Sequence, residues 1–228
     1  EFRGSMYRGL WPGIVASAHL EAGFIESWGD EGIRINNRFF KGGNSFRGFD
    51  VAGLGPREIQ YSFATEDLAL DPGVSPPDFS APVLIDGVHQ TNSAGQLLYK
   101  TAARDDAGNV LEPTLTAFNA LGGKAYAIGS LELSFPIPYA PEELGIDGAL
   151  FAEVGTLGLL DDADRDRKAD DAFNSFRVDD SASLRASAGV SIFWDSPFGP
   201  IRFDFSQILA KEEYDRTETF RFSTNTRF

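Results

Sequence analysis

The residues best able to do chemistry in this sequence are one arginine in a glycine-rich segment and two glutamates in strand-like segments. Residues 42–58, GGNSFRGFDVAGLGPRE, place Arg47 among five glycines. Glycine permits positive φ angles and close backbone approach, so this segment can fold compactly around one guanidinium group. A guanidinium presents five donors in a planar fork that suits carboxylates. Glu132 and Glu153 lie on the polar faces of their segments and are therefore candidate partners of Arg47.

Two carboxylates could also act as a general acid and a general base, which is the alternative chemistry for Glu132 and Glu153. A neighbouring arginine, however, would keep both groups ionised. The sequence has only two histidines and no cysteine, and it lacks a nucleophile elbow, a phosphate-binding loop and a paired-histidine metal motif. We therefore expect a protein that is not an enzyme, with no catalytic residues, no cofactor and no metal site.

One acidic segment, residues 161–171, has some features of a calcium-binding loop. Asp162, Asp164 and Asp166 alternate as calcium ligands do. The sixth position is Arg167 instead of glycine, and no glutamate closes the loop. We expect a solvated acidic loop here.

Charge and hydropathy narrow the possible functions. The 228 residues carry a net charge of −14, which disfavours nucleic acid as a partner because phosphate binding depends on clustered lysine and arginine. No apolar run reaches the roughly 18 residues that a membrane-spanning helix needs. A mean hydropathy of −0.19 usually indicates a soluble protein. A transmembrane β-barrel is the exception, because its strands alternate lipid-facing and lumen-facing side chains.

Six segments alternate apolar and polar residues with the period of two that is typical of β-strands. Each is close to the length of about ten residues that a membrane barrel requires. A partial seventh strand is expected at residues 2–9. The six segments are residues 13–25, 127–135, 148–159, 184–194, 200–208 and 219–228.

The faces of these strands are apolar on one side and largely polar on the other. In residues 127–135 this division requires one offset at Gly129, so that Ile128 shares the apolar face with Leu131. Phenylalanine occurs 20 times, several times on the alternating apolar positions, as expected of lipid-facing strands. The fold prediction is all-β, an antiparallel transmembrane β-barrel portion of about seven strands that form an incomplete barrel.

Connection lengths support a barrel, because outer-membrane barrels have short periplasmic turns and long extracellular loops. A soluble two-sheet β protein with one wet face is the alternative fold, and it gives no reason for loop length to alternate. The expected periplasmic connections are LWPG, PIPYAPEELG and WDSPFGP. The expected extracellular ones are residues 29–122, DDADRDRKADDAFNSFRVDD and AKEEYDRT.

We expect residues 1–228 to form one domain, the C-terminal part of a barrel domain, with one long extracellular loop at about 29–122. An insertion at residues 59–121 breaks the strand rhythm with proline-rich and glycine-rich turn signals. Within it, residues 84–112 are expected to form small hairpins. The start of the chain, EFRGSMYRGLW, lacks the pattern of a signal peptide, so we expect a mature product or a fragment.

Several motifs in order resemble one known family. RFFKGGNSFRGF followed by GPRE is similar to the arginine-glycine-aromatic loop of the POTRA-and-barrel outer-membrane superfamily, of the bacterial surface antigen type. The segments after the loop resemble its final strands, and the likeness covers essentially the whole chain except residues 59–121. These segments are GGKAYAIGSLELSFPIP, LFAEVGTL, LRASAGVSIFWDSPFGPIRFDFSQIL and YDRTETFRFSTNTRF.

This resemblance implies roles for particular residues. The loop would fold into the barrel lumen, with Arg47, Gly48 and Phe49 as its motif, and Arg47 would pair with Glu132 and Glu153. The family usually carries aspartate at the latter place. The alternative is that Arg47 only staples a large loop.

The end of the chain, FRFSTNTRF, resembles the C-terminal strand signal of outer-membrane proteins, carried here by Phe220, Phe222 and Phe228. The alternative reading is that Phe228 simply packs into lipid.

The resemblance also implies a function. Members of the assembly branch fold and insert β-barrel proteins into the bacterial outer membrane of Gram-negative cells. Their partners would be outer-membrane lipids and lipopolysaccharide, unfolded outer-membrane clients and accessory lipoproteins. The family barrel has sixteen strands, so the missing N-terminal strands and POTRA domains would be partners too. The alternative function is a secretion or translocation pore of the same superfamily, of the TamA type or a two-partner secretion transporter.

Overall fold

A computed structural model describes residues 1–28, 32–138, 141, 144–165, 173–197 and 199–224 of the chain. The chain divides into two compact units. The first unit contains residues 1–57, 120–165 and 179–228. The second contains residues 58–119 and the described part of 166–178.

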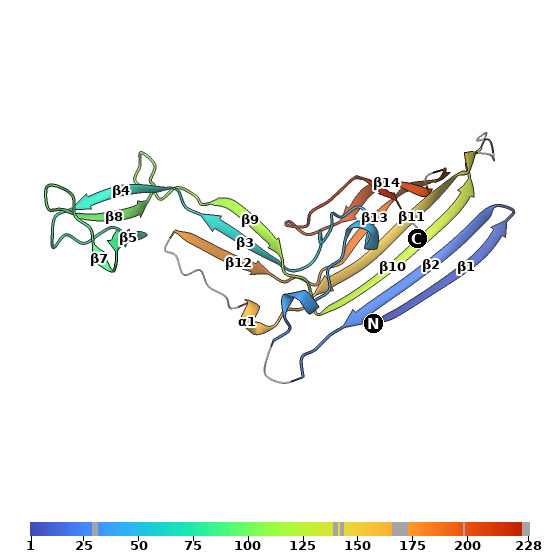
Figure 1. Cartoon of the computed structure of the whole chain (residues 1–228), viewed down its shortest axis with the longest axis horizontal. Helices are drawn as coiled ribbons and strands as arrows, with labels where there is room; N and C mark the ends of the chain where they lie inside the picture. Colours follow the sequence, from blue (N-terminus) through green and yellow to red (C-terminus); the bar gives the residue numbers. More distant parts are fainter. Residues whose placement is uncertain (29–31, 139–140, 142–143, 166–172, 198, 225–228) are drawn as a thin grey trace. The chain divides into compact units, whose positions relative to one another are not determined.

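The first unit is built on a seven-stranded antiparallel sheet whose strands run side by side in Figure 1. Every strand predicted by the period-two pattern is present, and the partial strand at the start of the chain is a complete one. In spatial order the strands are β1 (Phe2–Trp11), β2 (Ile14–Phe24), β10 (Ala125–Pro136), β11 (Ile146–Gly158), β13 (Arg185–Ser196), β14 (Gly199–Ala210) and β15 (Phe220–Thr224).

The sheet is open, and its edge strands in the described chain are β1 and β15. The fold prediction, an all-β antiparallel portion of an incomplete barrel, is confirmed. Connections 12–13, 137–145 and 197–198 lie at one end of the sheet, while 25–124, 159–184 and 211–219 lie at the other. The two longest are at the second end. The sorting by length is incomplete, however, because residues 137–145 and 211–219 are equally long.

The two faces of the sheet differ as the alternation predicts. Leu20, Leu131 and Phe222 are more than half exposed on the outer face, whereas Glu153 and Asp204 are buried on the inner face. The predicted offset at Gly129 is wrong. The pairing of β10 with both neighbours continues without a shift, so Ile128 lies on the inner face and is 4% exposed.

Ile128 is buried there because the long loop after β2 packs on the inner face and supplies a hydrophobic core. This loop contains two short 3-10 helices, η1 (Ile35–Asn37) and η2 (Gly43–Ser45). Phe46 and Phe49 from the loop are fully buried against β10 and β11. The core comprises Phe46, Phe49, Leu54, Tyr126, Ile128 and Leu157, with Phe39 and Ile208 packed beside it.

The second unit has three small sheets. One orders the strands β12 (Asn174–Asp179), β3 (Arg57–Ser62) and β9 (Thr114–Ala120). Another orders β4 (Thr65–Leu70), β8 (Leu97–Ala102) and β5 (Ser80–Pro82). The third is a hairpin of β6 (Leu84–Ile85) and β7 (Val88–His89), joined by an Asp-Gly turn of the kind that favours tight hairpins. Small hairpins therefore occur in the segment where they were expected.

The only α-helix in the described residues is the single turn α1 (Asp162–Arg165). None of the helices described is long and apolar enough to cross a membrane.

Candidate functional site: an arginine held on the inner face of the sheet

The segment that carries Arg47 folds into a tight loop because glycine stands where the backbone requires it. Gly42 has a φ of 123°, and a Cβ there would lie 2.0 Å from the carbonyl oxygen of Asp50. Ser45 Oγ donates to the Gly42 carbonyl at 2.8 Å and accepts from its amide at 3.0 Å. The amide of Gly43 donates to the carbonyl of Phe49 at 2.8 Å, which closes the loop around Arg47.

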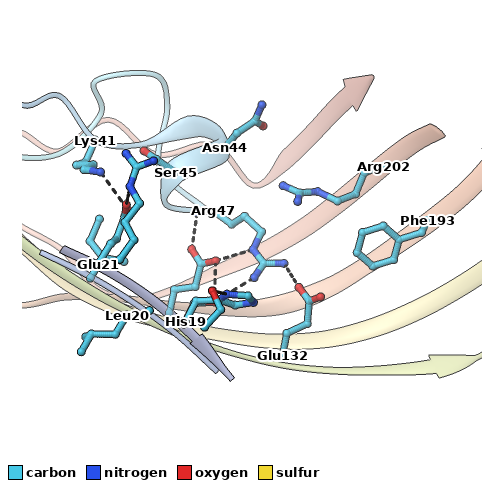
Figure 2. Close-up of a pocket in the computed structure, with 16 residues that line it drawn as sticks. His19, Leu20, Glu21, Lys41, Asn44, Ser45, Arg47, Glu132, Phe193 and Arg202 are labelled. Atoms are coloured by element: carbon cyan, nitrogen blue, oxygen red, sulfur yellow. Dashed lines mark hydrogen bonds and ion pairs between the residues drawn. The ribbon is translucent and has the colours of Figure 1, made fainter. Parts of the chain in front are cut away.

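Arg47 points from this loop onto the inner face of the sheet, toward Glu132 on β10 (Figure 2). Its Nη1 lies 2.6 Å from Glu132 Oε2, and its Nε lies 2.7 Å from Glu153 Oε1 on β11. The backbone amide of Arg47 donates to the other oxygen of Glu153 at 2.6 Å. The Arg47 side chain is only 6% exposed, so the structure brings together the three residues that the sequence proposed as partners.

Serines on two strands add further bonds. Arg47 Nη1 donates to Ser191 Oγ on β13 at 3.2 Å, and Nη2 donates to Ser130 Oγ on β10 at 3.4 Å. The carbonyl of Arg47 accepts from Ser187 Oγ on β13 at 2.7 Å. A single loop residue is thus bonded to three adjacent strands.

An aromatic ring completes the surroundings of the guanidinium. The guanidinium carbon of Arg47 lies 3.8 Å from the ring centre of Phe151, in the geometry of a cation–π contact. Phe151 is a large apolar residue on the inner face, and it has room because its neighbour across the strands is Gly189. A Cβ on Gly189 would lie 2.7 Å from the Phe151 ring.

The charges of the site favour a fixed ion pair. Burial by itself lowers the pKa of the Arg47 guanidinium, but Glu153 and Glu132 outweigh this effect and the pKa is raised above its ordinary value. The arginine stays charged, and each carboxylate faces a permanent cation. This arrangement is suited to holding a loop in place. The site borders a cavity of about 590 Å³.

The next strand, β14, extends the site through a residue that the sequence reasoning missed. Asp204 is completely buried, accepts from Ser191 Oγ at 2.5 Å and from Arg202 Nε at 2.8 Å. Ser191 has a single hydroxyl proton, which it donates to Asp204 while it accepts from Arg47. Strand register could have revealed this contact, since Ser191 and Asp204 are direct cross-strand partners.

Other ion pairs hold the remainder of the loop, and no sequence pattern pointed to them. Lys41 Nζ lies 3.0 Å from Glu21 on β2 and 3.8 Å from the Tyr126 ring centre. Lys124 contacts both Glu26 and Asp161 at 2.8 Å. These partners are distant in sequence, so only the folded sheet identifies them.

The other predicted residues have different positions. Gly48 adjoins β13 and β14, and a Cβ there would lie 2.7 Å from Ile208 Cδ1. Phe49 is buried in the inner core, whereas Phe220 and Phe222 project from the outer face of β15 and are about half exposed. Phe228 lies outside the described residues.

The acidic segment at 161–171 is only partly described. Asp162 is exposed, Asp164 forms an ion pair with Arg38, and Asp166 and Arg167 lie outside the described residues. No cluster of three or more potential metal ligands is found among the residues that the structure describes.

An open antiparallel sheet with one apolar outer face, and a long loop held by ion pairs on its inner face, defines a portion of an outer-membrane β-barrel. The chain belongs to the Omp85 superfamily, whose domain model matches residues 1–228. The predicted family is therefore confirmed, and with it the predicted location in the bacterial outer membrane.

Two curated relatives are outer membrane protein assembly factors named BamA. The one from Neorickettsia risticii is 27% identical over 208 residues, which is 91% of this chain and 19% of the relative. The one from Neisseria meningitidis serogroup B is 32% identical over 116 residues, which is 47% of this chain and 15% of the relative. The chain thus spans less than a fifth of the length of these relatives.

A solved structure has a similar fold. The crystal structure of BamA from Haemophilus ducreyi lacking POTRA domains 1–3 superimposes with a TM-score of 0.57 at 19% sequence identity. The match covers 96% of this chain and 32% of that one. The resemblance to the barrel of this superfamily that the motifs predicted is confirmed, and the similar barrels are those of BamA.

Proposed function

We propose that residues 1–228 are the C-terminal part of the barrel domain of an outer-membrane protein assembly factor, which folds and inserts β-barrel proteins into the bacterial outer membrane. The observation that carries the proposal is the Arg47 loop bonded across the inner face of the sheet, in a chain similar to BamA over 91% of its length. The process is physical, without chemical turnover and without a cofactor.

The proposed mechanism uses the edge of β15. Within the described chain β15 pairs only with β14, and the edge proposed to meet client strands is its other side. A sheet edge of this kind can pair with a strand of another chain. Phe220 and Phe222 face outward beside it and serve as part of the C-terminal strand signal, together with Phe228.

The Arg47 loop acts in this mechanism as a brace. Because Arg47 ties β10, β11 and β13 to one loop, it keeps the wall of the barrel in register next to the β15 edge. The proposed partners are unfolded outer-membrane clients, outer-membrane lipids and lipopolysaccharide, accessory lipoproteins, and the N-terminal strands and POTRA domains of the complete protein.

The test is client folding by the full-length protein in liposomes. We expect Arg47→Ala to slow the appearance of protease-protected, heat-modifiable client, while the control Arg104→Ala in the second unit leaves it unchanged. Client folding at the unaltered rate with Arg47→Ala would contradict the proposal. Steady ion conductance in planar bilayers, without client folding by the unaltered protein, would favour the pore alternative.

A further inference from the structure

The connection that leads into β15 runs along the Arg47 motif and pairs with it as a strand does. Phe49 and Thr217 are antiparallel bridge partners. The amide of Asp50 donates to the Arg216 carbonyl at 2.9 Å, and the amide of Arg216 donates to the Gly53 carbonyl at 2.7 Å. We call residues 215–218 the strap.

A third backbone bond continues the same ladder at the far end of the strap. The amide of Glu218 donates to the carbonyl of Gly48 at 3.0 Å. Gly48 directly follows Arg47, so the strap is bonded to the residue next to the one that binds both glutamates. The motif is therefore bonded both to the sheet and to the chain that becomes β15.

A buried ion pair anchors the start of the strap. Arg185, the first residue of β13, donates from Nε to Asp215 Oδ2 at 3.0 Å and from Nη2 to Oδ1 at 3.3 Å. The two side chains are 2% and 1% exposed. Asp215 Oδ2 also accepts from the amide of Glu212 at 2.8 Å, and Arg185 Nη1 donates to the carbonyls of Ser181 and Ser183. Both charged groups are therefore well supplied with hydrogen bonds, as burial requires.

The other end of the strap is joined to β15 itself. Glu218 forms an ion pair with Arg221, which lies on the inner face of β15. The Arg221 guanidinium lies against Gly43 of the Arg47 loop, where a Cβ would be 3.3 Å from three of its atoms. The amide of Ser206 on β14 donates to the carbonyl of Thr219 at 2.8 Å, just before β15 begins.

We propose that Arg185 and Asp215 are positioning residues that set the place of β15 through the strap, so that the Arg47 loop and the edge strand move as one body. The inference deepens the proposed function and rests on it, since the edge of β15 is the surface assigned there to client strands. Moving the strap together with β15 away from β14 requires the strap to leave either the motif or Arg185. Breaking the second contact leaves a charge buried without its partner, which is strongly unfavourable.

Hydrogen exchange of the full-length protein in lipid nanodiscs tests the coupling. We expect Asp215→Asn to accelerate exchange at the strap amides of Arg216 and Glu218 and at the β15 amides, by about tenfold or more. The matched control is Arg216→Gln, which alters the neighbouring and exposed pair with Asp50 and leaves the backbone ladder intact. Faster exchange at the strap with unchanged exchange at β15 would overturn the proposal.

A second variant covers the case in which Asp215→Asn does not fold. Arg185→Met combined with Asp215→Leu removes both charges, and replacing a buried pair by apolar residues often preserves folding. A difference in gel mobility between unheated and heated samples shows whether the barrel of this variant has folded. We expect this double variant to fold and still to show faster exchange at the strap and β15, because the directional fork is gone. Exchange like that of the unaltered protein would overturn the proposal.

The rate of client folding, measured with the same variants, distinguishes a failure of this inference from a failure of the proposed function. Faster β15 exchange together with slower client folding supports both. Faster β15 exchange with client folding at the unaltered rate supports the coupling and contradicts the role of the β15 edge. Unaltered β15 exchange overturns the coupling whatever the rate of client folding.

Discussion

Arg47 can serve several strands at once because its donors and the acceptors around it have matching shapes. Glu153 accepts from both the backbone amide and Nε of the same residue, which fixes the direction of the side chain. This double contact uses both oxygens of a glutamate, at a position where the resembled family usually carries aspartate. The remaining donors reach Glu132, Ser191 and Ser130. A lysine has no such fork and cannot replace this arginine without loss.

A double-mutant cycle measures the coupling between Arg47 and Glu132. We expect Arg47→Ala and Glu132→Gln each to lower the free energy of unfolding of the barrel. Arg47→Ala leaves two carboxylates without their cation, and Glu132→Gln removes one of the two carboxylates that compensate the buried guanidinium. Their combined effect should be smaller than the sum by about 1–3 kcal/mol. Urea unfolding in detergent micelles provides the measurement. Strictly additive effects would remove Glu132 as an energetic partner.

Ser191 links Arg47 to Asp204, and removal of its hydroxyl group should weaken the surroundings of both residues. Ser191→Ala takes a donor from a completely buried carboxylate and an acceptor from the guanidinium, so we expect a loss of about 1–3 kcal/mol in unfolding free energy. Ser134→Ala, on the same face of β10 farther from Arg47, is the control, with an expected effect below about 0.5 kcal/mol. Equal effects of the two variants would exclude the link.

At the scale of elements, the strands of the sheet were readable from the sequence and the loop was not. Alternation identified all seven strands, because a lipid-facing outer side and a polar inner side impose a period of two. It failed at Ile128, where an apolar residue faces inward. The reason is that Phe46 and Phe49 cover the inner face there, and a loop that returns to the sheet leaves no periodic trace.

The site was partly predictable, because the alternation of the strands also shows which side chains face inward. Glycines around Arg47 marked the motif, and strand parity placed Glu132 and Glu153 on the inner face. Parity also placed Ser191 and Asp204 there, but their pairing depends on the register of β13 with β14. The contact of Arg185 with Asp215 depends on the path of a connection, which no local pattern specifies.

The base of the long loop should respond to pH through Asp161. Its carboxylate accepts from Lys124 and from the Ile33 amide, and the Lys124 hydrogen bond is the largest cause that lowers the pKa of Asp161 below its ordinary value of 3.8. Because the folded pKa is lowered, this contribution to stability is present above the ordinary value and is lost as pH falls through the folded one.

Lys124 behaves in the opposite sense. Its hydrogen bond to Asp161 raises the pKa of Lys124 above 10.5, so its contribution is present below that value and is lost as pH rises through the folded one. We expect hydrogen exchange of the Ile33 amide, corrected for the intrinsic effect of pH on exchange, to be constant between the pKa of Asp161 and the pKa of Lys124. Exchange should accelerate below the first pKa and above the second. Asp161→Asn should abolish the acceleration at low pH. Acceleration at low pH that persists in this variant would exclude Asp161 as its cause.

At the scale of the whole molecule, the second unit is an insertion whose last residues return to the place where the insertion begins. The amide of Leu121 donates to the carbonyl of Pro56 at 2.9 Å, so the two ends of the insertion lie next to each other in the first unit. The seven-stranded sheet and the Arg47 site use no residue between 59 and 119.

Replacing residues 59–119 by a short glycine-serine linker should therefore leave the barrel intact. We expect the full-length variant to keep its heat-modifiable mobility and the same protection of the β10 and β11 amides, because the linker has only to span neighbouring ends. Loss of both properties would show that the insertion supports the sheet.

Arg47 is synthesised long before the groups that bind it, since Glu132, Glu153 and Ser191 follow it by 85, 106 and 144 positions. Contacts at such separations form late, after the cost of closing large loops has been met. The guanidinium can be buried only after β10, β11 and β13 have assembled. Burial of Arg47 therefore reports that these three strands have assembled, and a chain in which they have not yet assembled leaves its guanidinium exposed to solvent.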